Sequence, residues 1–403
     1  MQRLINSHQK TAFIVKDAKT YINAEEAWYK FSGKKEGSFL FIIIPVKDPN
    51  NTIPTFKKVI DTAKWEDVIW FYSLSNYSPR EYKRLVKRWK LLEWFNNGKE
   101  YILNFIDRIR LDQLAKRYKP VEKVFSGHRN TQEHLAAALA PNEHFLMDSG
   151  MGITNKINNK GYIDYRSYLR RHRFKYLMHI LSGMKVYSRG KTKFFTVYKD
   201  SVTTKHEVIE NEYSYRKMLV KKKELGNLTF YISSPLYRRH NISLNQYILF
   251  LKELFAHYKL NAADVVYIPH PVHENSESIE IIIDELGCQL DERDIPVETK
   301  ITLYDTLPNK CITPYSSSLV NISVFSENRF PLIFAWHGEF DCFETLFNWK
   351  KDSLESNPNI TIDRLTNFTS LFGFENSRCD KPKFKDFEVW DAAVNSKSFI
   401  RNE

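Results

Sequence analysis

Two apolar stretches decide the fold of this chain: FLFIIIPV at residues 39–46 and DVIWFYSL at residues 67–74. Continuous apolar runs of this length are typical of strands that are buried on both faces within a parallel sheet. The first run is too short to span a bilayer, and polar, charged sequence precedes it. We therefore read it as a buried strand and expect neither a membrane span nor a signal peptide.

Helices and strands alternate after these runs. Pro79 opens a basic helix predicted over residues 79–95, because proline tolerates the first helical position, where a backbone N–H is not needed. A strand (121–127), a helix (131–140) and a strand (144–148) follow, and a second basic helical stretch covers 165–183. Strands that alternate with helices predict a parallel sheet built from βαβ units.

The pattern starts afresh near Gly226, where LTFYISSPL at 228–236 reads as the first strand of a second unit. It continues with a helix (243–258), a strand ending in His-Pro (264–271), a helix near 298–304, a strand or loop at 310–315, a helix after Ser318 and a strand at 331–338. We expect an α/β protein with two Rossmann-like α/β/α domains facing a central cleft, divided as 1–225 and 226–380. Residues 381–403 would form a C-terminal segment that packs back on the first domain.

Charge is distributed unevenly between the two halves. Residues 1–240 hold 45 Lys and Arg against 23 Asp and Glu, whereas residues 241–403 hold 15 against 25. Such an excess fits an anionic partner, such as nucleic acid, an anionic membrane or an acidic polymer, although a solvated basic face is an equal alternative. The four cysteines are far apart without a CxxC pair, which favours reduced thiols in a cytosolic protein.

Two candidate site residues lie where strands are predicted to end. Asp148 follows HFLM and precedes Ser149 and Gly150, so it is either a turn-forming residue or a general base at the edge of the sheet. His270 precedes Pro271, which ends the strand, and a histidine there can hydrogen-bond or protonate a leaving phosphate. Ligands of open α/β sheets bind beyond the carboxyl ends of the strands, so the coincidence of both residues there favours function.

Two further candidates lie at predicted helix starts. Glu298 follows Ile295-Pro296, where an acidic residue suits the helix dipole but could also accept hydrogen bonds from ribose hydroxyls. The hydroxyls of Ser316, Ser317 and Ser318 precede a helix, where they and the free backbone N–H groups can hold a phosphate. N-capping alone explains one of these three serines.

The stretches YIPHP (267–271), IPVETKITL (295–303) and YSSSL (315–319), in this order, resemble the donor-site motifs of bacterial sialyltransferases, most of all the capsular polysialyltransferases. Asp148-Ser149-Gly150 resembles their acidic-acidic-Gly motif, with serine in the middle position. The motifs cover about 145–320 of the chain. The resemblance implies the GT-B fold, CMP-sialic acid as the donor substrate, inversion at the anomeric centre, and neither a metal nor a cofactor.

The same resemblance implies individual roles. Asp148 would be the base, His270 would assist the CMP phosphate, Glu298 would hold the ribose, and Ser317 and Ser318 would hold the phosphate. Gly150, Pro271 and Ser316 complete the expected donor site. The residues themselves show no HExxH motif, Cys/His cluster or Gly-rich phosphate loop, so we expect no metal site.

The basic excess then favours a polyanionic glycan acceptor, because polysialic acid carries a carboxylate on every sugar. The expected basic groove includes the segments 83–90, 166–175, 216–223 and 237–240, with Arg170, Arg171 and Arg173 as its central residues. One alternative is a sialyltransferase that caps a terminal galactose of lipooligosaccharide, with the basic surface on the inner membrane. Another is a nucleic-acid-binding protein, but no reading motif supports it, and we expect no nucleic-acid partner. The expected location is the cytoplasm, with peripheral association at the inner membrane or with a capsule-synthesis complex.

Overall fold

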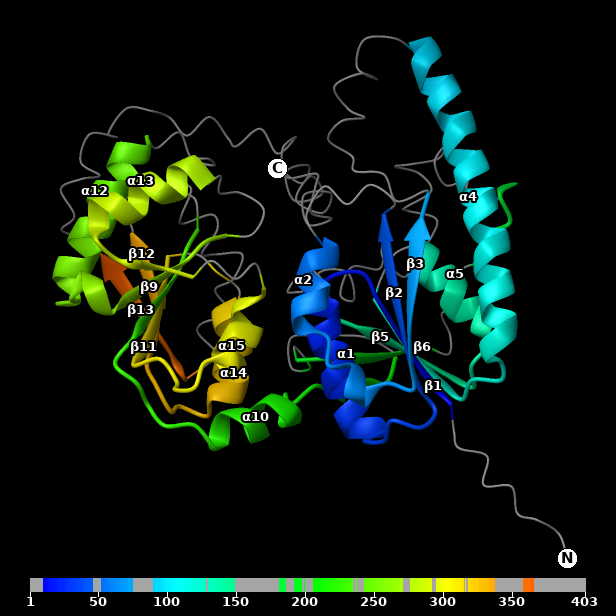
Figure 1. The fold of residues 1–403 in the computed structure, drawn as a ribbon, viewed down its shortest axis with the longest axis horizontal. Coiled ribbons are helices and arrows are strands. Elements are labelled where there is room, and N and C mark those ends of the chain that lie inside the picture. The colour runs from blue at the N-terminus through cyan, green and yellow to red at the C-terminus, as the bar shows by residue number, and fades with distance from the viewer. Residues whose placement is uncertain are drawn as a thin grey trace, which may run out of the picture. The chain divides into compact units, whose positions relative to one another are not determined.

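The computed structural model describes residues 10–45, 52–74, 90–127, 130–148, 181–185, 192–197, 199, 206–234, 237, 243–270, 276–291, 295–314, 316, 318–337 and 358–365. The chain divides into two compact units between Asn211 and Glu212. Each unit contains one parallel sheet with helices on its faces (Figure 1).

The first unit is built on a sheet in the order β3-β2-β1-β4-β5-β6-β7, and every neighbouring pair is parallel. Its strands are β1 (Thr11–Val15), β2 (Ser38–Pro45), β3 (Asp67–Ser73), β4 (Lys123–Ser126), β5 (Glu143–Met147), β6 (Thr192–Thr196) and β7 (Val208–Glu210). Its helices are α1 (Ala18–Phe31), α2 (Thr52–Val59), α4 (Lys90–Tyr118) and α5 (Asn130–Leu139), with a 3-10 turn η1 (Thr62–Lys64).

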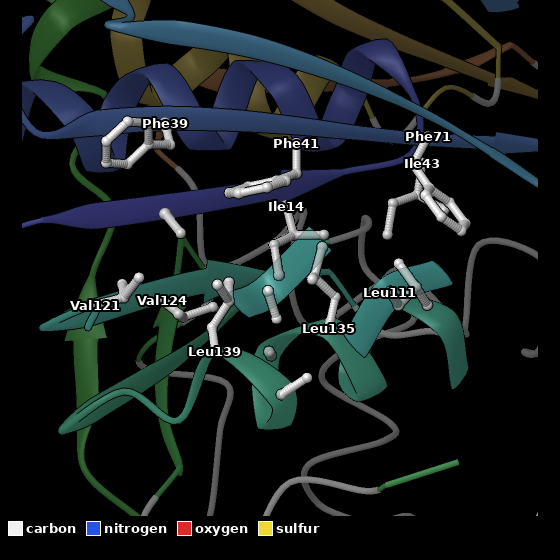
Figure 2. Packing of buried hydrophobic residues seen from close by; sticks show 14 of the residues in the cluster. Ile14, Phe39, Phe41, Ile43, Phe71, Leu111, Val121, Val124, Leu135 and Leu139 are labelled. Atoms are coloured by element: carbon white, nitrogen blue, oxygen red, sulfur yellow. The ribbon is translucent and has the colours of Figure 1, made fainter. Parts of the chain in front are cut away.

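Both faces of this sheet are buried, as the continuous apolar runs predict. On β2, Phe39, Phe41 and Ile43 pack with α4 and α5, as Figure 2 shows for Leu111, Leu135 and Leu139 of those helices. The alternate residues Leu40, Ile42 and Ile44 join the cluster that includes α1, α2 and Trp65. Successive side chains of a strand point to opposite faces, so one uninterrupted apolar run fills two cores.

The second unit repeats the same plan with a sheet in the order β10-β9-β8-β11-β12-β13, again with parallel pairs. Its strands are β8 (Thr229–Ile232), β9 (Val265–Ile268), β10 (Gln289–Leu290), β11 (Lys310–Thr313), β12 (Leu332–His337) and β13 (Ile360–Leu365). Its helices are α10 (Ser214–Lys221), α12 (Leu244–His257), α13 (Ser276–Leu286), α14 (Val297–Leu303) and α15 (Ser318–Ser326), with a 3-10 turn η4 (Ala262–Asp264). Helices α12 and α13 cover one face, and α14 and α15 lie on the other (Figure 1).

The expected class is therefore confirmed in that the chain has two Rossmann-like α/β/α units. The division differs from the expected 225/226, because α10 contacts α14 and α15 and so belongs to the second unit. The cleft between domains and the placement of residues 381–403 stay predictions, and that segment lies outside the described residues.

One helix differs from its expected bounds. The sequence pattern placed a helix over 79–95, whereas α4 runs from Lys90 to Tyr118, and residues 75–89 lie outside the described part. A helix-interior glycine such as Gly98 costs about 1 kcal/mol relative to alanine. The burial of Leu111 and Ala115 against the sheet offsets that cost, so the helix continues.

Candidate functional site

In the second sheet, β9 and β10 are added on one side of β8, whereas β11, β12 and β13 are added on the other side. The switch point of the strand order therefore lies between β8 and β11. Ligands of open parallel sheets bind at such a switch point, outside the carboxyl ends of the strands. His270 follows β9, Ser316 follows β11, and Glu298 lies at the start of α14, the helix after β10; all three are at that edge. The topology therefore gathers sequence-predicted residues that lie up to about fifty positions apart in the chain.

At the end of β11, a short series of hydrogen bonds shapes the start of α15. The Thr313 hydroxyl donates to the Ile232 carbonyl of β8 (2.8 Å) and accepts from the Ser316 backbone N–H (3.0 Å). The Ser316 hydroxyl in turn accepts from the backbone N–H of Ser318, the first residue of α15 (3.2 Å). The Ser316 side chain therefore satisfies the backbone N–H of the first residue of α15, and a hydroxyl that accepts one hydrogen bond can also donate its proton to an acceptor such as a phosphate oxygen.

Glu298 lies in the first turn of α14 and is only 3% exposed. Its Oε1 accepts a hydrogen bond from Nδ2 of Asn321, in the first turn of α15 (2.8 Å). The contact joins the N-terminal turns of two helices that both begin at the carboxyl edge of the sheet. Glu298 thus holds the starts of α14 and α15 together through this hydrogen bond.

His270 lies two residues after β9 and is half-buried, so the structure places it at the same edge. Sequence reasoning missed its neighbours on the adjacent strand. Ser233 and Ser234 follow β8 directly, and the Ser233 hydroxyl hydrogen-bonds the Tyr267 hydroxyl (2.7 Å). The signal was present in the residues SSP after a buried strand, but we read 228–236 as one continuous strand.

Asp148 belongs to the first unit, directly after β5, as predicted. Its side chain is buried, and Oδ2 accepts a hydrogen bond from the Val197 backbone N–H at the end of the neighbouring β6 (2.9 Å). Within the described part of the chain, Oδ1 is buried and has no hydrogen-bond partner. A carboxylate held by one oxygen leaves the other free to take a proton.

The same burial changes the acidity of this group. Burial raises the pKa of Asp148 to about 7, although hydrogen bonds from Thr196 and Val197 and the positive charge of Lys19 act in the opposite direction. A carboxyl with a pKa near the working pH suits general acid–base chemistry. A turn residue exposed to water would not have this pKa, so the environment supports the functional reading of Asp148.

Several expected site residues lie outside the described part of the chain: Ser149, Gly150, Arg170, Arg171, Arg173, Pro271 and Ser317. Among the described residues, no group of three or more His, Cys, Asp or Glu side chains forms a metal site. In the same part of the chain, no helix is both long enough and apolar enough to cross a membrane.

One basic segment requires a correction. We expected 216–223 to line the groove of the first domain, but α10 belongs to the second unit. There Arg216 is 2% exposed, and the Lys223 ammonium donates to the Tyr304 carbonyl. A buried guanidinium cannot contribute to an open binding surface. Segment 237–240 lies after the boundary at Asn211 and therefore also belongs to the second unit, whereas we expected it to line the first.

No protein-family model matches the chain, and no curated protein matches it by sequence. Among solved structures, it is similar to a UDP-GlcNAc 2-epimerase from Methanocaldococcus jannaschii, at 8% identity and a TM-score of 0.45 over 91% of both chains. A family 9 glycosyl transferase from Veillonella parvula has 9% identity and a TM-score of 0.38, covering 98% of this chain and 96% of that one. An E. coli heptosyltransferase has 11% identity and a TM-score of 0.37, covering 97% and 98%. Likeness at this level does not identify the activity of this chain.

Proposed function

We propose that this chain is an inverting, metal-independent sialyltransferase that transfers sialic acid from CMP-sialic acid to a growing polysialic acid chain. One observation supports the donor site above all others. His270, Glu298, Ser316 and Ser318 come from separate motifs: His270 follows β9, Glu298 lies in the first turn of α14, and the two serines follow β11, all at the carboxyl edge of the second sheet. Ligands of open parallel sheets bind at this edge, which supports a shared role for these motifs.

The proposed chemistry divides between the two units. Asp148 takes the proton of the acceptor hydroxyl, and the acceptor oxygen bonds to the anomeric carbon of the donor. The bond from that carbon to the phosphate oxygen breaks at the same time, and its electron pair leaves with CMP. His270 and the α15 start stabilise the charge on the leaving phosphate, which is the role that metal ions have in other transferases.

The polymer acceptor is the finer part of the proposal and is supported by charge. Residues 1–211 carry 38 Lys and Arg against 21 Asp and Glu, so the basic excess remains with the first unit even without α10. The alternative is a transferase that adds a single sugar to a galactose on lipooligosaccharide. The burial of Arg216 removes one basic side chain of segment 216–223 from the expected polyanion groove.

The direct test incubates the purified protein with CMP-sialic acid and labelled oligosialic acid or lactose, and sizes the products by chromatography. Transfer to oligosialic acid in repeated steps supports the whole proposal. Transfer only to lactose supports the capping enzyme, and transfer to neither contradicts both. Turnover should persist in EDTA, and loss that Mg²⁺ restores would contradict the metal-independent mechanism.

Variants then test the site. Asp148→Asn should lower turnover by about 10²- to 10⁴-fold, the usual cost of losing a general base, with CMP binding nearly unchanged. His270→Ala and the double variant Ser317→Ala with Ser318→Ala should lower turnover with CMP-sialic acid more than affinity, because their contacts strengthen as the phosphate gains charge. Ser323→Ala is a matched control within α15, where the Ser323 hydroxyl donates to the Val320 carbonyl (2.7 Å).

A further inference from the structure

Two buried asparagines connect Asp148 to the end of the first unit. Asn23 lies in α1 and Asn211 directly after β7, and each is 1% exposed. Asn211 Nδ2 donates to Asn23 Oδ1 (3.0 Å), and Asn23 Nδ2 donates to the backbone carbonyl of Asp148 (2.9 Å). The orientation of the Asn23 amide is defined by these two bonds, because its oxygen accepts from an N–H group and its nitrogen donates to a carbonyl.

A second series of hydrogen bonds, made by backbone N–H groups, also connects Asn211 to Asp148. The Asn211 N–H donates to the Thr196 carbonyl (2.9 Å), which extends the β6–β7 pairing by one residue. Val197, the residue after Thr196, donates its backbone N–H to Oδ2 of Asp148 (2.9 Å). Asp148 is therefore held at its main chain by one path and at its carboxylate by the other, and both paths meet at Asn211.

This closed set of hydrogen bonds determines which oxygen of Asp148 is left over. Oδ2 is occupied by Val197, and rotation of the carboxylate would break that bond inside a buried site. Oδ1 remains buried and without a partner among the described residues. An unpaired buried acceptor costs free energy, and a substrate group that donates to it would remove that cost.

From this geometry we infer that Asn23 and Asn211 are positioning residues that aim Oδ1 of Asp148 at the acceptor hydroxyl. The inference rests on the proposed function. These hydrogen bonds also connect Asp148 to the boundary between the units, because Asn211 is the last residue of the first unit's main segment. A displacement of the chain at Asn211 would be transmitted to Asp148 through two sets of hydrogen bonds.

The test compares Asn23→Ala and Asn211→Ala with Asn142→Ala. The control residue also lies in the first unit, at the opposite end of β5, and its amide bonds Glu122 at the surface (2.6 Å). Two quantities are measured in each folded variant: the kinetics of transfer, and the titration of Asp148 by carboxyl-carbon NMR with labelled aspartate, assigned with Asp148→Asn. If an alanine variant does not fold, Asn→Ser replaces it, because the hydroxyl can bind water but is too short to bridge.

Both alanine variants should lower kcat by roughly 10- to 100-fold through misplacement of the base, with the KM for the donor unchanged. The pKa of Asp148 should fall by roughly one pH unit, because water enters the vacated space and solvates the carboxylate. Lys19 on α1 is the charged group that acts on Asp148, and it is intact in every variant. Asn142→Ala should change neither quantity.

The outcomes separate this inference from the proposed function. An unchanged pKa of Asp148 in folded variants overturns the positioning role, whether or not kcat falls, because a loss of rate alone would then arise elsewhere. An equal effect of Asn142→Ala overturns it as well. If the pKa moves as expected but the wild type transfers no sugar from CMP-sialic acid, the positioning of Asp148 stands and the proposed function fails.

Discussion

At the scale of single residues, Asp148 has the most distinctive environment of the candidate site. Burial raises its pKa to about 7. A base must be ionised to accept a proton, so transfer should be slow below this pH and rise through it. We expect an acidic limb in the pH profile of kcat with an apparent pKa near 7. A limb near the ordinary carboxyl pKa, about 4, would assign it to another group.

The same shift predicts how stability depends on pH. The folded protein holds the Asp148 proton up to about pH 7, whereas the unfolded chain loses it near pH 4. Between these values the folded state binds more protons, so its stability falls as the pH rises. A shift of this size corresponds to about 4 kcal/mol at roughly 1.4 kcal/mol per pH unit.

Asp148→Asn removes this penalty. Its melting temperature should therefore exceed that of the wild type at pH 8, and the difference should shrink as the pH falls toward 4. Thermal melts of both proteins across this range measure the effect. A difference that is constant with pH would mean that Asp148 is ionised in the folded protein throughout.

At the scale of elements, the contact between α14 and α15 is the part of the candidate donor site that a single substitution removes most cleanly. Asn321→Ala leaves the buried Glu298 carboxylate without its donor, which should cost about 1–3 kcal/mol of stability. CMP affinity should fall as well, because the starts of α14 and α15, which we propose to hold the ribose and the phosphate, are no longer hydrogen-bonded to each other. Ser323→Ala, in the same helix, is the control, and equal CMP affinity in the two variants would show that this contact does not shape the site.

Capping determines where other helices begin, and here local sequence suffices. Asp17 accepts from the Thr20 N–H at the start of α1 (2.8 Å), and Ser243 accepts from Gln246 at the start of α12 (3.2 Å). In both cases the side chain three residues later returns a bond to the cap, which completes a capping box. These signals lie within four residues of each other and are therefore visible in the sequence, although our predicted helices include α12 and omit α1.

At the scale of the whole molecule, the polymer acceptor predicts a dependence on salt. If the basic residues of the first unit hold polysialic acid, rates on long acceptors should fall steeply with salt, and rates on a very short acceptor should fall less. Charges act over only about 8 Å near physiological ionic strength, and a long chain has more contacts to lose. Initial rates on sized acceptors measure this, and equal salt dependence would contradict the basic groove.

Product length tests the same surface by mutation. Neutralising Arg170, Arg171 and Arg173 together should shorten the products while CMP binding is retained. Lys221→Ala with Lys222→Ala is the control, since both lysines are exposed and belong to the second unit. If the control shortens the products equally, net charge is responsible and the arginine segment has no particular role.

The sequence by itself determined the elements whose signals are local. The run at 39–46 is β2, the run at 67–74 is β3, and the segments around His270, Glu298 and Ser318 end or begin elements close to the expected positions. Periodicity and capping act over a few residues, so they can be read without knowing the partners. The same signals did not identify β1, because TAFIV is five residues long and its central place follows from pairing with β2 and β4.

The tertiary structure decided what depends on distant residues. It placed the division at Asn211, because α10 finds its contacts in the second unit, and the parallel strand order put the candidate segments after β9 and β11 at one edge of the sheet. It also brought Asn23, Asp148 and Asn211 together from three parts of the chain. Neither the raised pKa of Asp148 nor its one unpaired oxygen is visible in DSG at 148–150, because burial and hydrogen bonding arise only when separate strands and helices pack.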